Sequence, residues 1–105
     1  MSLKPLSYPF AGIINNHHVS TVLIGRHYLP KHGDYMNDEL ILQLVSLLVG
    51  KTFPIDSTTN GVEYFVADIE FGDPVKVYRL IWLFEGEKLE ILGVVNAYRR
   101  KKVKT

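Results

Sequence analysis

The feature that most constrains the fold is a close series of three apolar segments, residues 62–71, 75–84 and 89–98. They are separated only by Gly72-Asp73-Pro74 and by residues 85–88, which include Glu85-Gly86-Glu87. Each segment is rich in β-branched and aromatic residues, which favour strands. Because such short connections leave no room for a crossover, consecutive strands must pair antiparallel. The sequence therefore predicts an antiparallel β-meander in its second half.

A shorter pair of strands is predicted near the start of the chain. Residues 10–14 and 19–24 are mainly apolar, and Asn15-Asn16 between them is typical of a tight turn. We therefore expect a hairpin at residues 10–24. Pro5 and Pro9 interrupt the preceding residues, so residues 1–8 are expected to be irregular.

One helix is predicted at residues 37–49. Asn37 is a favourable N-cap, Asp38 and Glu39 suit the positive end of the helix dipole, and Gly50 can end the helix. The residues expected to form its apolar face are Leu40, Ile41, Leu44, Leu47 and Leu48. The expected fold is α+β, with an N-terminal hairpin and one main helix packed on an antiparallel β-meander.

Length and composition favour one domain spanning residues 1–105, because 105 residues suffice for a single core. The chain has no cysteine, which excludes disulfides and thiolate metal sites. No run of 18 apolar residues or secretory signal is present, so we expect a cytoplasmic domain without membrane contact.

Charge is distributed unevenly along the chain. Twelve basic residues oppose eleven acidic ones, but five of the basic residues belong to the basic tail, residues 99–105. Subtracting those five leaves seven basic against eleven acidic residues, a net charge of −4 for residues 1–98. The tail is therefore either a solvated terminus or a contact for nucleic acid.

Arg79 is the first candidate functional residue. It lies in the apolar segment 75–84, where an unpaired guanidinium would be costly to bury. Two interpretations remain open: an ion pair with Asp68 or Glu70 on the neighbouring strand, or an anion-binding role.

The segment between the hairpin and the helix supplies further candidates. His27, Lys31 and His32 place imidazoles beside a cation within six residues, which suits acid/base chemistry on a phosphate. The alternative is that these are idle loop histidines. The spacing matches no HExxH or facial-triad motif, so we expect no metal and no cofactor.

The end of the last predicted strand combines an aromatic residue with arginines. In Asn96-Ala97-Tyr98-Arg99-Arg100, alternation places Tyr98 and Arg100 on one face and Arg99 on the other. Tyr98 could stack a base while the arginines hold phosphates. Tyr98 could equally cap the core beside a solvated tail.

These segments resemble a known family of small ribonucleases. Tyr78-Arg79-Leu80-Ile81-Trp82 is similar to the core strand of RelE-like toxins, and Asn96-Ala97-Tyr98-Arg99-Arg100 is similar to their basic C-terminal end. The resemblance extends to the wider barnase–EndoU–colicin–RelE group and covers residues 25–102. His27 to His32 lies where some members carry a histidine.

The resemblance implies metal-independent cleavage of RNA by attack of a 2′-hydroxyl, without a cofactor. The catalytic residues it implies are His27 or His32 as acid or base, with Arg79 and Arg99 holding the scissile phosphate. The nucleic-acid contacts would be Lys31, Tyr98, Arg100, Lys101 and Lys102. The implied partners are RNA and an antitoxin or other protein.

Two other interpretations of the sequence remain. The first is a non-catalytic module that binds a protein or nucleic acid through its sheet, with electrostatic help from the basic tail. The second is an enzyme that holds a small ligand between helix and sheet. Convergence of Arg79, Arg99 and a histidine in one cleft would favour the nuclease over the binding module.

Overall fold

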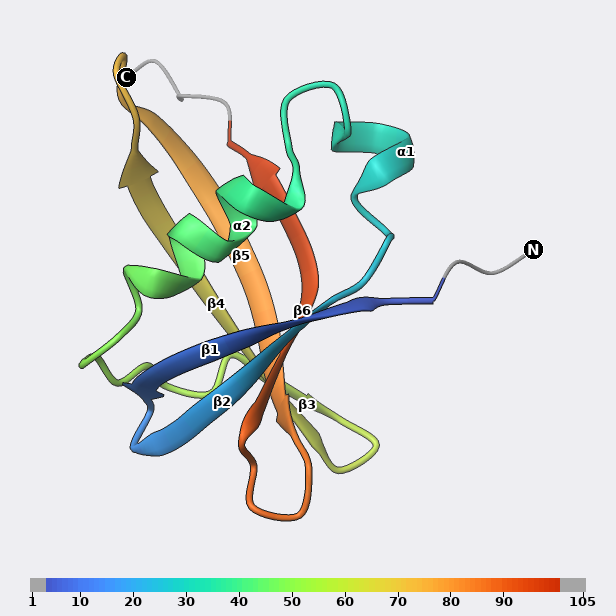
Figure 1. The fold of residues 1–105 in the computed structure, drawn as a ribbon, viewed down its shortest axis with the longest axis vertical. Coiled ribbons are helices and arrows are strands. Elements are labelled where there is room, and N and C mark those ends of the chain that lie inside the picture. Colours follow the sequence, from blue (N-terminus) through green and yellow to red (C-terminus); the bar gives the residue numbers. More distant parts are fainter. Residues whose placement is uncertain (1–3, 101–105) are drawn as a thin grey trace.

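The computed structural model describes residues 4–100, and these residues form one six-stranded sheet and two short helices (Figure 1). The strands are β1 (Leu6–Ile14), β2 (His17–Ile24), β3 (Ser57–Thr59), β4 (Val62–Phe71), β5 (Lys76–Glu85) and β6 (Ile91–Arg99). The helices are α1 (Leu29–His32) and α2 (Asp38–Ser46). The strands follow the order β1-β2-β6-β5-β4-β3, and only β2 and β6 are parallel neighbours.

The expected architecture of one main helix on an antiparallel meander is wrong. Over residues 4–100, strands make up 51% and helices only 13%. The hairpin β1–β2 joins the meander in the same sheet, through pairing of residues 21–24 with residues 91–94. The hairpin has an apolar face of its own, and joining the sheet buries that face in the common core.

The hairpin itself forms with longer strands than the sequence predicts. Asn15 and Asn16 have φ values of 53° and 64°, the left-handed conformation that a two-residue hairpin turn requires. β1 begins at Leu6, inside the segment that was expected to be irregular. Pro9 is accommodated because β1 is an edge strand, and the register shifts between Pro9 and Gly12.

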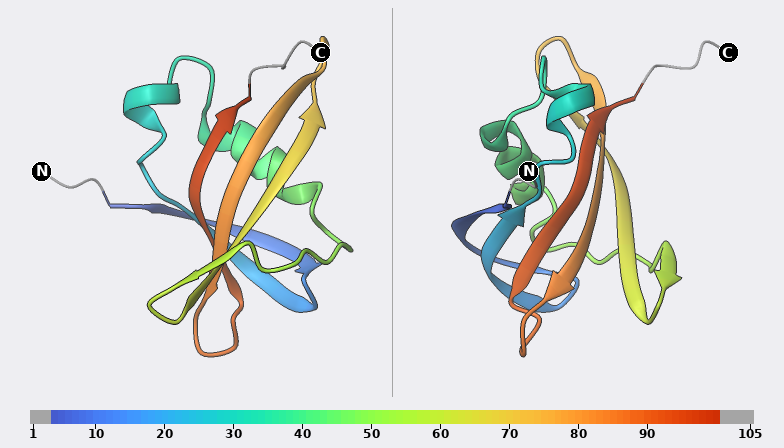
Figure 2. Two further views of the ribbon diagram at one scale, coloured as in Figure 1. Left: turned by 180° about the vertical axis from the view of Figure 1, so that it is seen from behind. Right: turned by 90° about the vertical axis from the view of Figure 1, so that its right-hand side faces the viewer.

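Helix α2 packs across one face of the sheet (Figure 2). Its start confirms the expected cap, because the Asn37 side chain accepts a hydrogen bond from the Leu40 N–H at 2.8 Å. The helix ends at Ser46, three residues earlier than predicted, and turns lead to Gly50. Leu47 was expected on the buried face but is 39% exposed, because it follows the last helical residue.

The core lies between α2 and the centre of the sheet. Trp82 of β5 is fully buried, with its ring 5.1 Å from that of Phe53 and 5.8 Å from that of Phe65. From α2 and the turn after it, the buried residues are Ile41, Leu44, Val45 and Leu48. Within residues 4–100, neither helix is long and apolar enough to cross a membrane.

Candidate functional site

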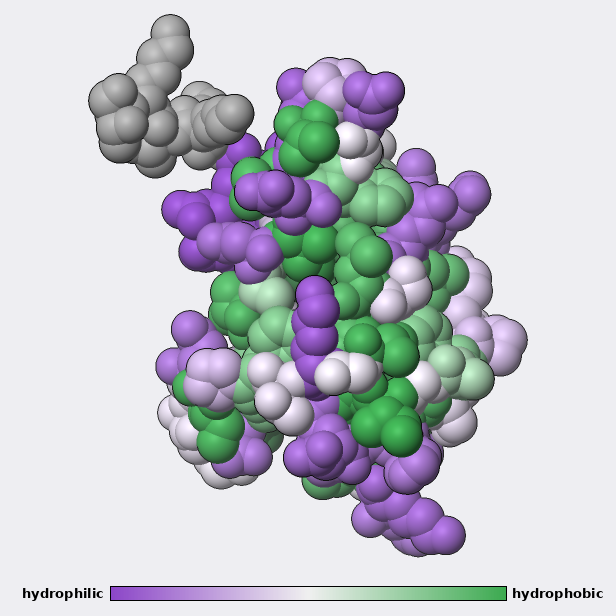
Figure 3. Space-filling view, turned by 90° about the vertical axis from the view of Figure 1, so that its left-hand side faces the viewer, coloured by the Kyte–Doolittle hydropathy of each residue, from purple (hydrophilic) through white to green (hydrophobic). Residues whose placement is uncertain are grey.

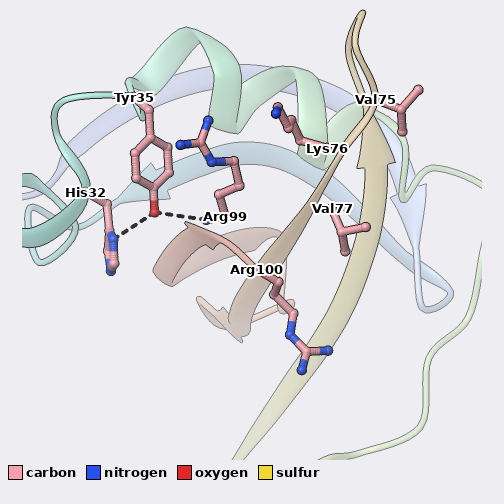
Figure 4. Close-up of a pocket in the computed structure, with 7 residues that line it drawn as sticks. All are labelled: His32, Tyr35, Val75, Lys76, Val77, Arg99 and Arg100. Carbon is pink, nitrogen blue, oxygen red and sulfur yellow. Dashed lines mark hydrogen bonds between the residues drawn. The ribbon is translucent and has the colours of Figure 1, made fainter. Parts of the chain in front are cut away.

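A cavity of about 600 Å³ lies at one end of the sheet, beside the connection between α1 and α2 (Figure 4). We call it the basic pocket, and it is lined by His32, Tyr35, Val75, Lys76, Val77, Arg99 and Arg100. Three of these side chains are cationic, one is an imidazole and none is a carboxylate. A lining of this kind raises the local concentration of anions.

Backbone hydrogen bonds hold the two sides of the basic pocket. His32 ends α1, and the Met36 N–H donates to its carbonyl oxygen at 2.8 Å, so the chain turns back with Tyr35 inside the turn. Met36 is only 2% exposed and anchors this turn in the core. On the sheet side, the Arg100 N–H donates to the carbonyl oxygen of Val77 at 2.8 Å, which extends the pairing of β5 and β6.

The Tyr35 hydroxyl connects His32 to strand β6. The backbone N–H of Arg99 donates to the Tyr35 hydroxyl oxygen at 3.0 Å, and that oxygen lies 2.8 Å from Nδ1 of His32. Since the hydroxyl oxygen already accepts from Arg99, its proton can be donated to Nδ1. The hydroxyl oxygen has a second lone pair and can also accept from Nδ1–H, so in either tautomer Nδ1 is engaged and Nε2 is the ring nitrogen left to meet a ligand.

Two ring contacts orient the imidazole and one guanidinium. His32 stacks on Tyr98 with ring centroids 5.4 Å apart and planes at 25°. The Arg99 guanidinium carbon lies 4.4 Å from the centroid of the Tyr35 ring, a cation–π distance. Both contacts restrict side chains that would otherwise rotate freely, so less conformational entropy is lost when a ligand binds.

The three cations of the basic pocket differ in how far they are neutralised. Within residues 4–100, the side chains of Lys76 and Arg99 take part in no salt bridge. Arg100 Nη1 lies 2.8 Å from Oδ2 of Asp68, so its charge is partly balanced from outside the pocket. The pocket therefore offers two unpaired cations and one paired cation.

Arg79 forms the ion pair that was one of its two expected roles. Its Nε and Nη2 donate to the two carboxylate oxygens of Asp68 at 2.9 and 3.2 Å. These hydrogen bonds raise the pKa of Arg79 and, together with Arg100, hold the pKa of Asp68 below its usual value. Arg79 does not line the basic pocket, but it shares Asp68 with Arg100 and lies opposite Tyr98, which stacks on His32.

His27 lies apart from the basic pocket, although only four residues separate it from His32. Its side chain lines a different, shallower cavity of about 260 Å³, together with Leu23, Tyr64, Leu83 and Glu85 among others. The structure therefore brings one histidine, not two, to the pocket that holds Arg99.

The remaining predicted contacts are placed as follows. Tyr98 supports His32 by stacking, and Arg100 lines the basic pocket. Lys31 is exposed on α1 and is not part of the lining. Lys101 and Lys102 lie outside the described residues.

Sequence reasoning missed two polar members of the basic pocket. Lys76 was not among the candidate residues, although its position directly after a turn places it at a sheet end. Tyr35 was not among the candidates either. No local pattern could have identified Tyr35, because its partners are His32 on one element and Arg99 on another.

A second polar cluster ties the hairpin to both helices. Asp38, at the start of α2, accepts hydrogen bonds from the hydroxyls of Tyr8 and Tyr28 and from Nη2 of Arg26. We call these four residues the Asp38 cluster. The side chains of Arg26 and Asp38 are each 15% exposed, and Tyr28 is 3% exposed.

The Asp38 cluster stabilises one protonation state of each group. Burial by itself raises the pKa of Asp38, but hydrogen bonds from Tyr28, Tyr8 and Arg26 outweigh it and hold that pKa below its ordinary value. Burial and the hydrogen bond to Asp38 raise the pKa of Tyr28 to about 12. Because its carboxylate is already engaged by three donors, we interpret this cluster as structural.

No metal-binding group of three or more His, Asp or Glu side chains is present within residues 4–100. Comparison with protein-family models, with curated proteins and with solved structures finds no match to this chain.

Proposed function

We propose that this protein binds single-stranded RNA at the basic pocket. The observation that carries the proposal is a cavity of about 600 Å³ that is lined by Lys76, Arg99, Arg100 and His32 and by no carboxylate. Lys76 and Arg99 supply its unpaired charges, whereas the Arg100 guanidinium points away from them toward Asp68 (Figure 4). Residues 1–98 carry a net charge of −4, which repels RNA at a distance. Binding must therefore come from a local concentration of cations such as this one.

The chemistry of the lining suits phosphates next to unpaired bases. Arg99 presents a planar guanidinium that matches two phosphate oxygens, and Lys76 adds a compact positive charge. Tyr35, Tyr98 and His32 add aromatic rings beside these cations. Cations that follow the backbone and rings that stack bases are the usual components of single-strand binding sites.

The test is a binding titration with a fluorescent oligouridylate, followed by anisotropy at several salt concentrations. The double variant Lys76→Ala/Arg99→Ala should bind at least about tenfold more weakly and flatten the slope of log affinity against log salt by about 1.4, since each contact contributes about 0.7. The double variant Lys51→Ala/Lys88→Ala removes the same charge from exposed positions outside the pocket and should bind as the parent does. Equal losses in the two variants, or no binding at low salt, would contradict the proposal.

Cleavage of the bound RNA is a second candidate function, favoured by the orientation of His32. When Nδ1–H donates to the Tyr35 hydroxyl, Nε2 carries no proton, faces away from that hydrogen bond and can take the proton of a bound 2′-hydroxyl. Arg99 lies beside the same tyrosine and can stabilise charge on the phosphate. The leaving oxygen needs a proton donor, for which the ammonium group of Lys76 is a candidate in the lining.

Incubation of the protein with end-labelled single-stranded RNA in EDTA tests this second function. We expect products ending in a 2′,3′-cyclic phosphate, lost in His32→Ala and retained in His27→Ala. Binding by His32→Ala should stay within a few-fold of the parent, because the two unpaired cations remain. Intact RNA after long incubation with the parent protein would reject cleavage without affecting the binding proposal.

A further inference from the structure

Strand β4 has a free edge along most of its length. β3 pairs with β4 only at residues 62–64, whereas β5 pairs with residues 65–71 on the other side. Within residues 4–100, residues 65–71 are therefore hydrogen-bonded to one neighbouring strand instead of two. A free strand edge is a template to which another extended chain can add.

The alternation of the ladder shows which backbone groups face this edge. Asn60-Gly61 is a two-residue turn, so the residues on either side of it form a hydrogen-bonded pair, and the backbone N–H and C=O groups of Val62 point toward β3. Because this direction alternates along a strand, those of Tyr64 also point toward β3. The Asp56 N–H donates to the carbonyl oxygen of Tyr64 at 2.9 Å, which agrees with this direction of the Tyr64 backbone groups. By the same alternation, the N–H and C=O groups of Val66, Asp68 and Glu70 point outward beyond the end of β3.

A groove runs beside this edge. It has a volume of about 250 Å³ and is lined by Leu47, Leu48, Lys51, Phe53, Ala67, Asp68, Ile69 and Glu70. Four consecutive residues of β4 line it, so the groove follows the strand backbone, and the end of α2 with Phe53 forms the opposite wall. Figure 3 views the side of the molecule on which β4 and the end of α2 lie and shows apolar surface between polar margins.

The charges at the edge favour one kind of occupant. Residues 65–71 carry Asp68 and Glu70 and no cation. Asp68 is paired with arginines, whereas Glu70 takes part in no salt bridge within residues 4–100. Antiparallel pairing of two copies through this edge would place carboxylates opposite one another, which is unfavourable. A strand with a basic residue opposite Glu70 is complementary instead.

We propose that the free edge of β4 binds an extended segment of a partner protein as an added strand, with alternating apolar and basic side chains. The apolar side chains lie opposite Ala67 and Ile69 and enter the groove against Leu48 and Phe53. The basic side chains lie on the other face of the sheet, with one opposite Glu70. This interface shares no lining residue with the basic pocket, although Asp68 of the groove pairs with Arg100 of the pocket, and the proposal does not depend on RNA binding.

The probe is the capped hexapeptide Lys-Val-Lys-Val-Lys-Val, titrated into isotopically labelled protein. We expect shifts and slowed hydrogen exchange at the amides of Val66, Asp68 and Glu70. Methylation of the lysine backbone nitrogens, which face β4 in this register, should weaken binding about tenfold or more. Methylation of the valine nitrogens, which face away, should have a much smaller effect.

Substitutions in the protein test whether the charge of Glu70 contributes to peptide binding. Glu70→Lys should weaken binding of the lysine peptide several-fold and favour Glu-Val-Glu-Val-Glu-Val, while Glu87→Lys, the same charge change in the β5–β6 turn, should do neither. Absence of binding, equal effects of the two methylations, or shifts confined to other surfaces would each overturn the proposal. Concentration-dependent dimerisation that protects the same three amides would overturn it in favour of a second copy.

Discussion

The Asp38 cluster and the basic pocket are both built from tyrosines and ionisable groups, but they use them in opposite ways. In the Asp38 cluster one carboxylate accepts from two hydroxyls and a guanidinium, at a site where the charged side chains are 15% exposed. In the basic pocket Lys76 and Arg99 have no counter-ion among the described residues, and His32 keeps one ring nitrogen free.

The paired charges of the Asp38 cluster contribute to stability, whereas the unpaired charges of the basic pocket are available for binding. A buried charge must be paired within the protein, because leaving it unpaired costs several kcal/mol. An exposed cation costs little to leave unpaired, and its charge remains available to a ligand. Removing a member of the Asp38 cluster should therefore change folding, whereas removing a cation of the basic pocket should change binding.

The largest expected effect is that of Asp38→Ala. This change leaves three donors without their acceptor, including a mostly buried guanidinium, and should lower the free energy of unfolding by about 3 kcal/mol. Urea unfolding measures the loss, and RNA affinity of the folded protein should stay within about twofold. Asp34→Ala, at an exposed carboxylate, should change stability by less than about 0.5 kcal/mol. If both variants lose the same stability, the cluster is not structural.

An intermediate effect on the free energy of unfolding is expected at alkaline pH. The pKa of Tyr28 is raised from 10.0 to about 12 in the folded protein, so the folded protein keeps a proton that the unfolded chain has released. The contribution of Tyr28 is therefore complete below pH 10, and the free energy of unfolding should fall as pH rises from 10 toward 12.

Denaturant titrations between pH 10 and about pH 12 measure the slope of the free energy of unfolding against pH. Tyr28→Phe should flatten it, whereas Tyr64→Phe, which removes a hydroxyl without a hydrogen bond among the described residues, should leave it unchanged. An unchanged slope in Tyr28→Phe would show that the alkaline loss of stability does not come from the Tyr28 hydroxyl.

A smaller effect on stability is expected from Asp68→Asn. Asp68 is paired like a member of the Asp38 cluster, but one of its partners, Arg100, lines the basic pocket. Its ion pairs with Arg79 and Arg100 are partly exposed, so their loss should lower the free energy of unfolding by less than about 1 kcal/mol. The same change releases Arg100 at the rim of the basic pocket and should raise RNA affinity a few-fold. A fall in RNA affinity would show that Asp68 positions Arg100 for binding instead of neutralising it.

Much of the local structure could be predicted. The segments at residues 62–71, 75–84 and 89–98 correspond to β4, β5 and β6 within two residues at each end, and Asn37 caps α2 as expected. The pairing of Arg79 with Asp68 was one of two alternatives, and the register that places them directly opposite decides it.

The site was only partly predictable. His32, Arg99 and Arg100 line the basic pocket, and Tyr98 stacks on one of its members. His27 belongs to another cavity because α1 changes the direction of the chain between the two histidines. Their proximity in sequence therefore said little about their distance in space.

The sequence by itself determined the strands of the hairpin and of the meander, the hairpin turn and the start of α2, because side-chain alternation, turn residues and caps act over a few neighbouring positions. It did not predict α1 or β3, which are only four and three residues long. Only the tertiary structure decided that β2 lies parallel to β6, that Tyr35 joins His32 to Arg99, and that β4 keeps a free edge. These features join residues far apart in the chain. They depend on how whole apolar faces are buried together, which no short stretch of sequence encodes.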